Sequence, residues 1–169
     1  MNRLILTTLV LLLPSMLFAQ VDPYEKWDKN YTEIDLSELL NSEQMYADSI
    51  ESNFDETQQL YFRAEKYRFV ATFTGNWRAF SDQRESIMSF VFKMIGVDQS
   101  ITRTIKNEIE LVCQFGKIWM PIQPQLEKSF KKEVKKNADV YLYTLFLNSH
   151  SSKGLSNIFF VSEFISEQN

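Results

Sequence analysis

The sequence predicts an α+β protein with a five-stranded, mostly antiparallel sheet that is curled or closed into a small barrel, together with two helices and a partly helical N-terminal segment. Between residues 61 and 166, apolar side chains alternate with polar ones in several stretches, as in strands with one buried face. Residues 82–95 and 124–136 instead have apolar side chains at helical spacing. Residues 20–60 are acidic and have only short periodic runs.

The first residues have the pattern of a secretory signal peptide. Basic Arg3 precedes an apolar run over residues 4–13, and small Ala19 precedes polar Gln20. An uncleaved membrane anchor is the alternative, but a spanning helix needs roughly 20 apolar residues. We therefore expect residues 1–19 to be removed near Ala19-Gln20 and the mature protein to be exported, either to a periplasm or out of the cell.

Charge and cysteine content limit the class of the mature chain. Cys113 is the only cysteine, so no internal disulfide can form and packing alone must hold the fold. Residues 20–66 contain twelve Asp or Glu against four Lys or Arg, whereas residues 67–169 contain ten against thirteen. We expect residues 20–60 to form an acidic segment beside a single β-rich domain over residues 61–166. The segment is either solvated or packed across a basic face of that domain.

Residues 36–52 are predicted to form one or two short helices. Asp35 precedes the first apolar pair of this stretch, and Glu38 follows three residues later, as in a capping box. The first strand of the domain follows from Tyr61, alternates clearly over residues 67–74, and is expected to end at Gly75-Asn76.

The clearest helix follows that strand. Asp82 with Glu85 forms a predicted N-terminal capping pair, and Gly96 supplies the stop. The apolar side chains of this helix occupy more than one face, so we expect it to be covered on more than one side. They are Ile87, Met88, Phe90, Val91, Phe92, Met94 and Ile95.

Residues 107–123 predict a β-hairpin. Apolar residues alternate on both sides of Gly116-Lys117, and a two-residue turn with glycine first suits a tight hairpin. The expected register pairs Phe115 with Ile118, Cys113 with Met120, and Leu111 with Ile122, so that one face of both strands is apolar.

A second helix, a central strand and a last strand complete the domain. Pro124 opens the helix at its first turn, and Asn137 is expected to end it. Residues 140–147 are apolar on both faces, which suits a central strand. A Ser-rich loop is expected over residues 148–154, followed by a strand over residues 158–165.

The order of these elements resembles that of the OB-fold, a five-stranded barrel with a helix between its third and fourth strands. The resemblance covers residues 65–165 and depends on element order alone. A half-open α+β sheet with two helices on one face is the alternative. The resemblance implies a ligand on the face around the second and third strands. The candidate residues there and beside the first strand are Trp119, Gln114, Glu110, Glu108, Trp77 and Arg78. Alternatively, Trp119 packs beneath the N-terminal segment.

The sequence offers no catalytic, metal-binding or cofactor motif. His150 is the only histidine, so it cannot build a zinc site by itself. The four glycines form no phosphate-binding loop. The pair Glu108 and Glu110 is a candidate for acid–base chemistry, although exposed strands carry such pairs routinely.

A cluster of lysines surrounds the apolar stripe of the second helix. Its members are Lys128, Lys131, Lys132, Lys135 and Lys136. The chain is acidic overall, which disfavours a nucleic-acid partner, and a solvated helix face explains the pattern. Contact with an anionic membrane surface is a weaker alternative.

These observations favour an exported, non-enzymatic binding module whose partner is another envelope protein or an extended polymer. The alternative is a hydrolase-like envelope enzyme that uses carboxylates. A further expectation is that residues 20–60 cover the binding groove until a partner displaces them.

Overall fold

The computed structural model describes residues 24–51, 61–151 and 154–166. The predicted signal peptide lies outside the described residues. The elements are α1 (Glu25–Asn30), β1 (Thr32–Glu33), α2 (Leu36–Glu51), β2 (Tyr61–Ala79), α3 (Asp82–Met94), α4 (Ser100–Thr104), β3 (Asn107–Cys113), β4 (Gly116–Pro121), α5 (Pro124–Glu133), β5 (Asp139–Ser151) and β6 (Gly154–Ser166). Among the helices of this described part, none has the length and apolar character needed to cross a membrane.

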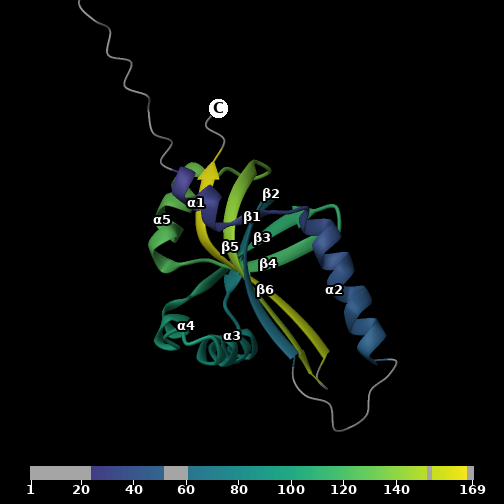
Figure 1. Ribbon diagram of the computed structural model, residues 1–169. Coiled ribbons are helices and arrows are strands. Elements are labelled where there is room, and N and C mark those ends of the chain that lie inside the picture. Colours follow the sequence, from purple (N-terminus) through teal and green to yellow (C-terminus); the bar gives the residue numbers. More distant parts are fainter. Residues whose placement is uncertain (1–23, 52–60, 152–153, 167–169) are drawn as a thin grey trace, which may run out of the picture.

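The strands form one curled sheet that is not closed. Its order is β4-β3-β2-β5-β6 with antiparallel neighbours, and the short β1 lies parallel beside β2. Figure 1 shows α2 along one side of the sheet, α5 on the other, and α3 with α4 together below α5. The α+β class and the curled sheet agree with the prediction. The numbers of strands and helices differ from the prediction. The described residues form six strands instead of five, and they form five helices, whereas two helices and a partly helical N-terminal segment were predicted.

Strand β2 continues past the predicted stop at Gly75. The residue has a φ of +89°, and the register against β3 shifts between Phe73 and Trp77, so Gly75 lies in a bulge and not at a strand end. A Cβ at Gly75 would lie 2.9 Å from Cγ of Lys136, so the close approach of Lys136 also requires glycine. The bulge lets one long strand pair with β5 along its first part and with β3 along its second part.

The predicted hairpin exists, but its register was wrong by four residues. Cys113 pairs with Gly116 and Leu111 with Ile118, so the turn is formed by Gln114 and Phe115. Gly116 has a φ of +128° and follows the turn. Gly116 is thus the first residue of β4, and its positive φ is a conformation that glycine adopts without a steric cost. Phe115 is consequently 53% exposed instead of facing the interior.

The predicted loop over residues 148–154 is mostly strand. β5 continues to Ser151 and pairs with β6 from Gly154, so β6 begins before the expected residue 158. His150 therefore lies buried in β5. β5 is central, between β2 and β6, as its two apolar faces predicted. Helix α5 ends at Glu133, before the expected Asn137.

The main core fills the inside of the curl. Phe130 of α5 is fully buried there, and its ring centroid lies 5.1 Å from that of Phe73 and 5.0 Å from that of Phe164. Leu36 and Leu40 of α2 belong to the same core. The described part of the acidic N-terminal segment is thus built into the core of the sheet. The other buried side chains of this core are Phe69, Ala71, Ile109, Leu111, Met120, Ile122, Val134, Val140, Leu142, Phe146, Phe159 and Val161.

A second, smaller core lies between α3 and the sheet. Met88, Val91 and Phe92 of α3 are buried, whereas Phe90 and Met94 remain partly exposed, so one face of α3 is buried instead of several. The N-cap is Ser81, one residue before the predicted Asp82, and its hydroxyl accepts a hydrogen bond from the N–H of Arg84. This cap places Arg84 in the first turn of α3, close to β4.

Candidate binding site

Four of the predicted residues lie together on the outer face of β2, β3 and β4. Arg78 is the register partner of Glu108, and Glu110 is the partner of Trp119. Side chains of directly opposite residues point to the same face of a sheet. Arg78, Glu108, Glu110 and Trp119 therefore share one surface, as the sequence predicted for the strand residues.

The other two predicted residues lie elsewhere. Trp77 points inwards, where its ring packs against Phe73 and Phe130 at centroid distances of 6.1 and 5.8 Å. Its continued alternation with Phe73 was a signal for this position, but the strand was predicted to end before it. Gln114 lies in the exposed hairpin turn, at the far end of β3 from Glu108.

Glu108 is held by two arginines. Its side chain is fully buried, with Oε2 lying 2.7 Å from Nε of Arg78 and Oε1 lying 2.7 Å from Nε of Arg84. Burial is the main cause that lowers the pKa of Arg84 from its usual value, and the charge of Glu108 opposes that shift. Two positive charges share one negative charge, so this cluster keeps a net positive charge.

Trp119 contacts both arginines, Arg78 through its ring and Arg84 through its backbone carbonyl. The guanidinium carbon of Arg78 lies 4.3 Å from the centroid of the Trp119 ring, a cation–π contact. Nη2 of Arg84 donates a hydrogen bond of 3.0 Å to the Trp119 carbonyl oxygen. Sequence reasoning missed Arg84, because no local pattern links the first turn of α3 to β3 and β4.

Arg78 has hydrogen-bond donors that no described residue uses. Its Nε is occupied by Glu108, but no described residue accepts a hydrogen bond from its two Nη atoms, and the side chain is 42% exposed. It borders a groove of about 740 Å³ between the start of α3 and the β5–β6 hairpin. The polar side chains that line this groove are those of Arg78, Arg84, Ser81, Gln83, Ser86, Ser149 and Ser156.

Glu110 lies on the same face but is engaged in a different network. Its Oε2 accepts hydrogen bonds of 2.7 Å from Asn76 and 2.8 Å from Thr74, and Nζ of Lys117 lies 3.5 Å away. These hydrogen bonds, with the Asn76 bond contributing most, hold the pKa of Glu110 below its usual range. The carboxylate is therefore ionised well below neutral pH.

Replacing Glu110 with glutamine is expected to remove an acid-sensitive part of the stability. A carboxylate whose pKa is depressed in the folded state contributes stability above its unfolded pKa, about 4.3, and loses it as pH falls through the folded pKa. Urea unfolding should therefore show wild type more stable than Glu110→Gln at pH 7, with the difference shrinking below about pH 4.3. The exposed Glu133→Gln variant is the matched control. A Glu110 difference that does not change with pH would contradict this assignment.

Two of the five lysines in the predicted cluster are engaged in contacts within the protein. Nζ of Lys131 lies 4.4 Å from the centroid of the Trp77 ring and 3.4 Å from Oε2 of Glu127, while the stem of Lys136 approaches Gly75. Lys128, Lys132 and Lys135 are exposed.

Within the described ranges, no three His, Cys, Asp or Glu side chains are grouped so that they could hold a metal ion.

The described N-terminal residues contact the tip of the β3–β4 hairpin and β5. The N–H of Phe115, at the hairpin tip, donates to Oγ of Ser37 at the start of α2, and Trp27 of α1 packs against Tyr143 of β5.

Comparison of the sequence with models of protein families and with curated proteins found no match.

Proposed function

We propose that the protein is an exported, non-enzymatic binding module that holds a carboxylate-bearing segment of an envelope protein or an extended polymer against Arg78. The observation that carries this proposal is the guanidinium of Arg78, held by the Trp119 ring and by Glu108, while no described residue accepts a hydrogen bond from its Nη atoms. A planar guanidinium donates two parallel hydrogen bonds to one carboxylate. Because its side chain is already fixed, little rotamer entropy is lost on binding.

The groove beside Arg78 has the composition of a polar binding site. Its second arginine and its serine hydroxyls can donate hydrogen bonds along an extended ligand. The groove is formed by the end of β2, the start of α3 and the β5–β6 hairpin. These segments come from separate parts of the chain, so the sheet fixes their relative positions.

The strand order supports this location. Counted from β2, the five long strands have the order third, second, first, fourth, fifth, and α5 connects the third to the fourth. Ile122, directly after β4, forms a parallel bridge with Val161 of β6. We propose that the sheet is an open relative of the OB-fold. OB-folds bind ligands at the second and third strands and at the loops that follow the first and fourth strands. The groove lies beside the equivalent segments.

A carboxylate-dependent hydrolase is the second candidate, and the geometry argues against it. A general acid needs a pKa raised towards neutral pH. Glu110 has a lowered pKa, and both oxygens of Glu108 are paired with arginines at zero exposure. We assign these carboxylates to the positioning of Arg78, Arg84 and the strands.

The proposal predicts that Arg78 dominates the affinity for anionic ligands. Hydrogen bonds to charged groups contribute about 1.5–3 kcal/mol. Arg78→Gln should therefore weaken binding of a blocked peptide of alternating Glu and Gly by roughly 10- to 150-fold in isothermal titration calorimetry. Arg78→Lys should recover only part of the affinity, since lysine lacks the planar fork.

The control is Arg103→Gln, which removes the same charge from an exposed position on α4. The same peptide with Gln in place of Glu should bind weakly to wild type, and an oligosaccharide of uronic acids tests whether the preferred ligand is a polysaccharide instead of a protein. Equal losses from Arg78→Gln and Arg103→Gln would show only a general effect of net charge, and the proposal would be wrong.

A further inference from the structure

A gap in the hydrogen-bonded ladder lies on one edge of β2. β1 pairs with Tyr67 and Arg68, and β3 pairs with β2 from Thr72 onwards. Ile34 donates to the carbonyl of Arg68 on this edge. On the opposite edge, the N–H of Phe73 donates to the carbonyl of Ala138 and the Phe73 carbonyl accepts from the N–H of Asn137, just before β5. Backbone groups alternate between the two edges of a strand. The N–H and C=O of Val70 therefore point into the gap, and no described backbone group bonds to them there.

Apolar side chains are exposed beside this gap. Val70 is 54% exposed and Val112 of β3 is 36% exposed. Both line a groove of about 820 Å³ that extends from β1 to the end of β3. An exposed strand edge with neighbouring apolar side chains is the surface that extended peptides use in β-augmentation.

The charge of this groove is negative. Its charged lining residues are Glu33, Asp35 and Asp139, and neither lysine nor arginine lines it. Asp139 accepts a hydrogen bond of 2.6 Å from Thr72, and Asp35 accepts bonds from backbone N–H groups at the start of α2. Among the described residues, neither aspartate is in an ion pair. Their negative charges thus remain available to a cationic ligand.

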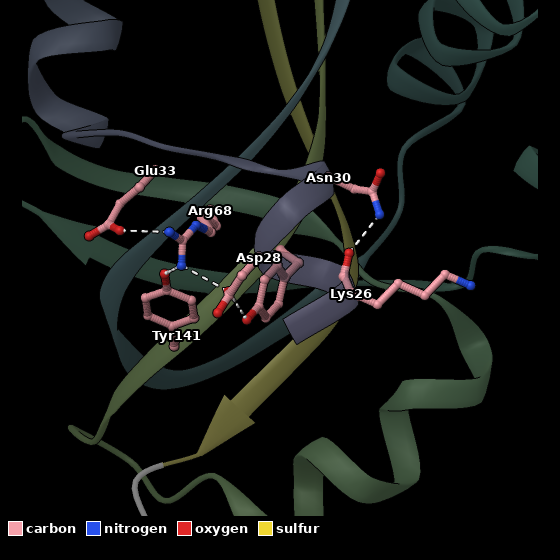
Figure 2. A network of polar contacts seen from close by, with 7 residues as sticks. Lys26, Asp28, Asn30, Glu33, Arg68 and Tyr141 are labelled. Carbon is pink, nitrogen blue, oxygen red and sulfur yellow. Dashed lines mark hydrogen bonds and ion pairs between the residues drawn. The ribbon is translucent and has the colours of Figure 1, made fainter. Parts of the chain in front are cut away.

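The walls of the groove are fixed by the network in Figure 2. Arg68 lies 2.8 Å from Asp28 of α1 and 2.9 Å from Glu33 of β1, and it donates to the hydroxyl of Tyr141, which also lines the groove. Tyr143 donates to the same Asp28 oxygen at 2.7 Å. These contacts join α1, β1, β2 and β5, so the gap does not depend on a single flexible side chain.

From these observations we infer that the groove binds an extended, cationic segment of a partner protein. One backbone amide of the segment pairs with Val70, an apolar side chain covers Val70 and Val112, and lysine or arginine side chains reach Asp35 and Asp139. Charge complementarity selects this occupant over an acidic chain, which the carboxylates of Asp35 and Asp139 repel. This site is separate from the Arg78 groove and has the opposite charge.

The test uses a blocked peptide of alternating Lys and Val, with the Glu and Val peptide as its acidic counterpart. In NMR titrations of ¹⁵N-labelled protein, the Lys peptide should shift the amide signal of Val70, and the Glu peptide should not. The double variant Asp35→Asn/Asp139→Asn should bind roughly three- to tenfold more weakly. Asparagine keeps the helix cap and the acceptor for Thr72, so the fold should be retained.

The matched control is Asp48→Asn/Glu65→Gln, which removes two exposed carboxylates outside the groove. Val70→Lys should abolish binding of the Lys peptide by placing a like charge at the contact. Equal weakening by both double variants would overturn the inference. So would unchanged binding in the groove variant, or self-association of the protein that the groove variant removes, since the occupant would then be a second copy.

Discussion

Replacing Glu108 with leucine is expected to lower the free energy of unfolding by about 3–5 kcal/mol, the usual cost of removing one partner of a buried ion pair. Glu108 is fully buried and pairs with Arg78 and Arg84 through separate oxygens. Arg78 can turn towards water because it is partly exposed. Arg84 is mostly buried, so its charge would remain without a partner inside the protein.

The double variant Arg84→Met/Glu108→Leu separates this cause from a general defect in packing. Replacing both partners of a buried pair with apolar side chains is often close to neutral. Urea unfolding at pH 7 should therefore show that the double variant is more stable than Glu108→Leu alone. If the double variant is less stable than either single variant, the cost comes from the shape of the site and the charge account is wrong.

Replacing Phe130 with alanine is expected to cost about 3–5 kcal/mol as well, the range for deleting a buried phenylalanine ring. Phe130 is the fully buried residue of α5, and its ring contacts Phe73 of β2, Trp77 of β2 and Phe164 of β6. It therefore joins β2 and β6, two strands that are separated by β5, through one side chain. Losing it leaves a cavity that the curled strands cannot readily fill.

Thermal and urea unfolding of Phe130→Ala should be compared with Ser129→Ala, which changes an exposed neighbour on the same helix. The control should stay within about 0.5 kcal/mol of wild type. Similar effects of the two substitutions would show that α5 does not contribute to the main core.

The hairpin shows what alternation can and cannot predict. The inward face of β3 and β4 was predicted correctly, because Ile109, Leu111, Ile118 and Met120 all face the core. The register was not. Shifting a strand by an even number of residues keeps every side chain on its face, so alternation allows both registers. The choice depended on whether Gly116 lies in the turn or after it.

The candidate site was predicted in part for similar reasons. Glu108, Glu110 and Trp119 were identified because strand periodicity places them on the polar face, whereas Arg78 was named only as a residue near the loop after the first strand. Arg84 was not, since its contact with Glu108 depends on how α3 packs against the sheet. Trp77 was placed on the surface because Gly75 was taken as a strand end instead of a bulge.

The N-terminal segment gives a third case. The capping pattern at Asp35 correctly predicted where α2 starts, and the Asp35 carboxylate accepts hydrogen bonds from the N–H groups of Ser37 and Glu38. Its acidic composition suggested a solvated segment beside the domain. Composition averages over all faces of a helix, whereas burial depends on the single face that carries Leu36 and Leu40.

The central claim is that Arg78, fixed on Trp119, is the contact for an anionic ligand. The most direct measurement follows the side-chain signals of Arg78 Nε–H and Trp119 Nε1–H in ¹⁵N-labelled protein during titration with the blocked Glu and Gly peptide. We predict that these two signals shift together and saturate at one dissociation constant, while the indole signals of Trp27 and Trp77 stay in place. Saturable binding that moves other signals and leaves Arg78 and Trp119 unchanged would contradict the claim.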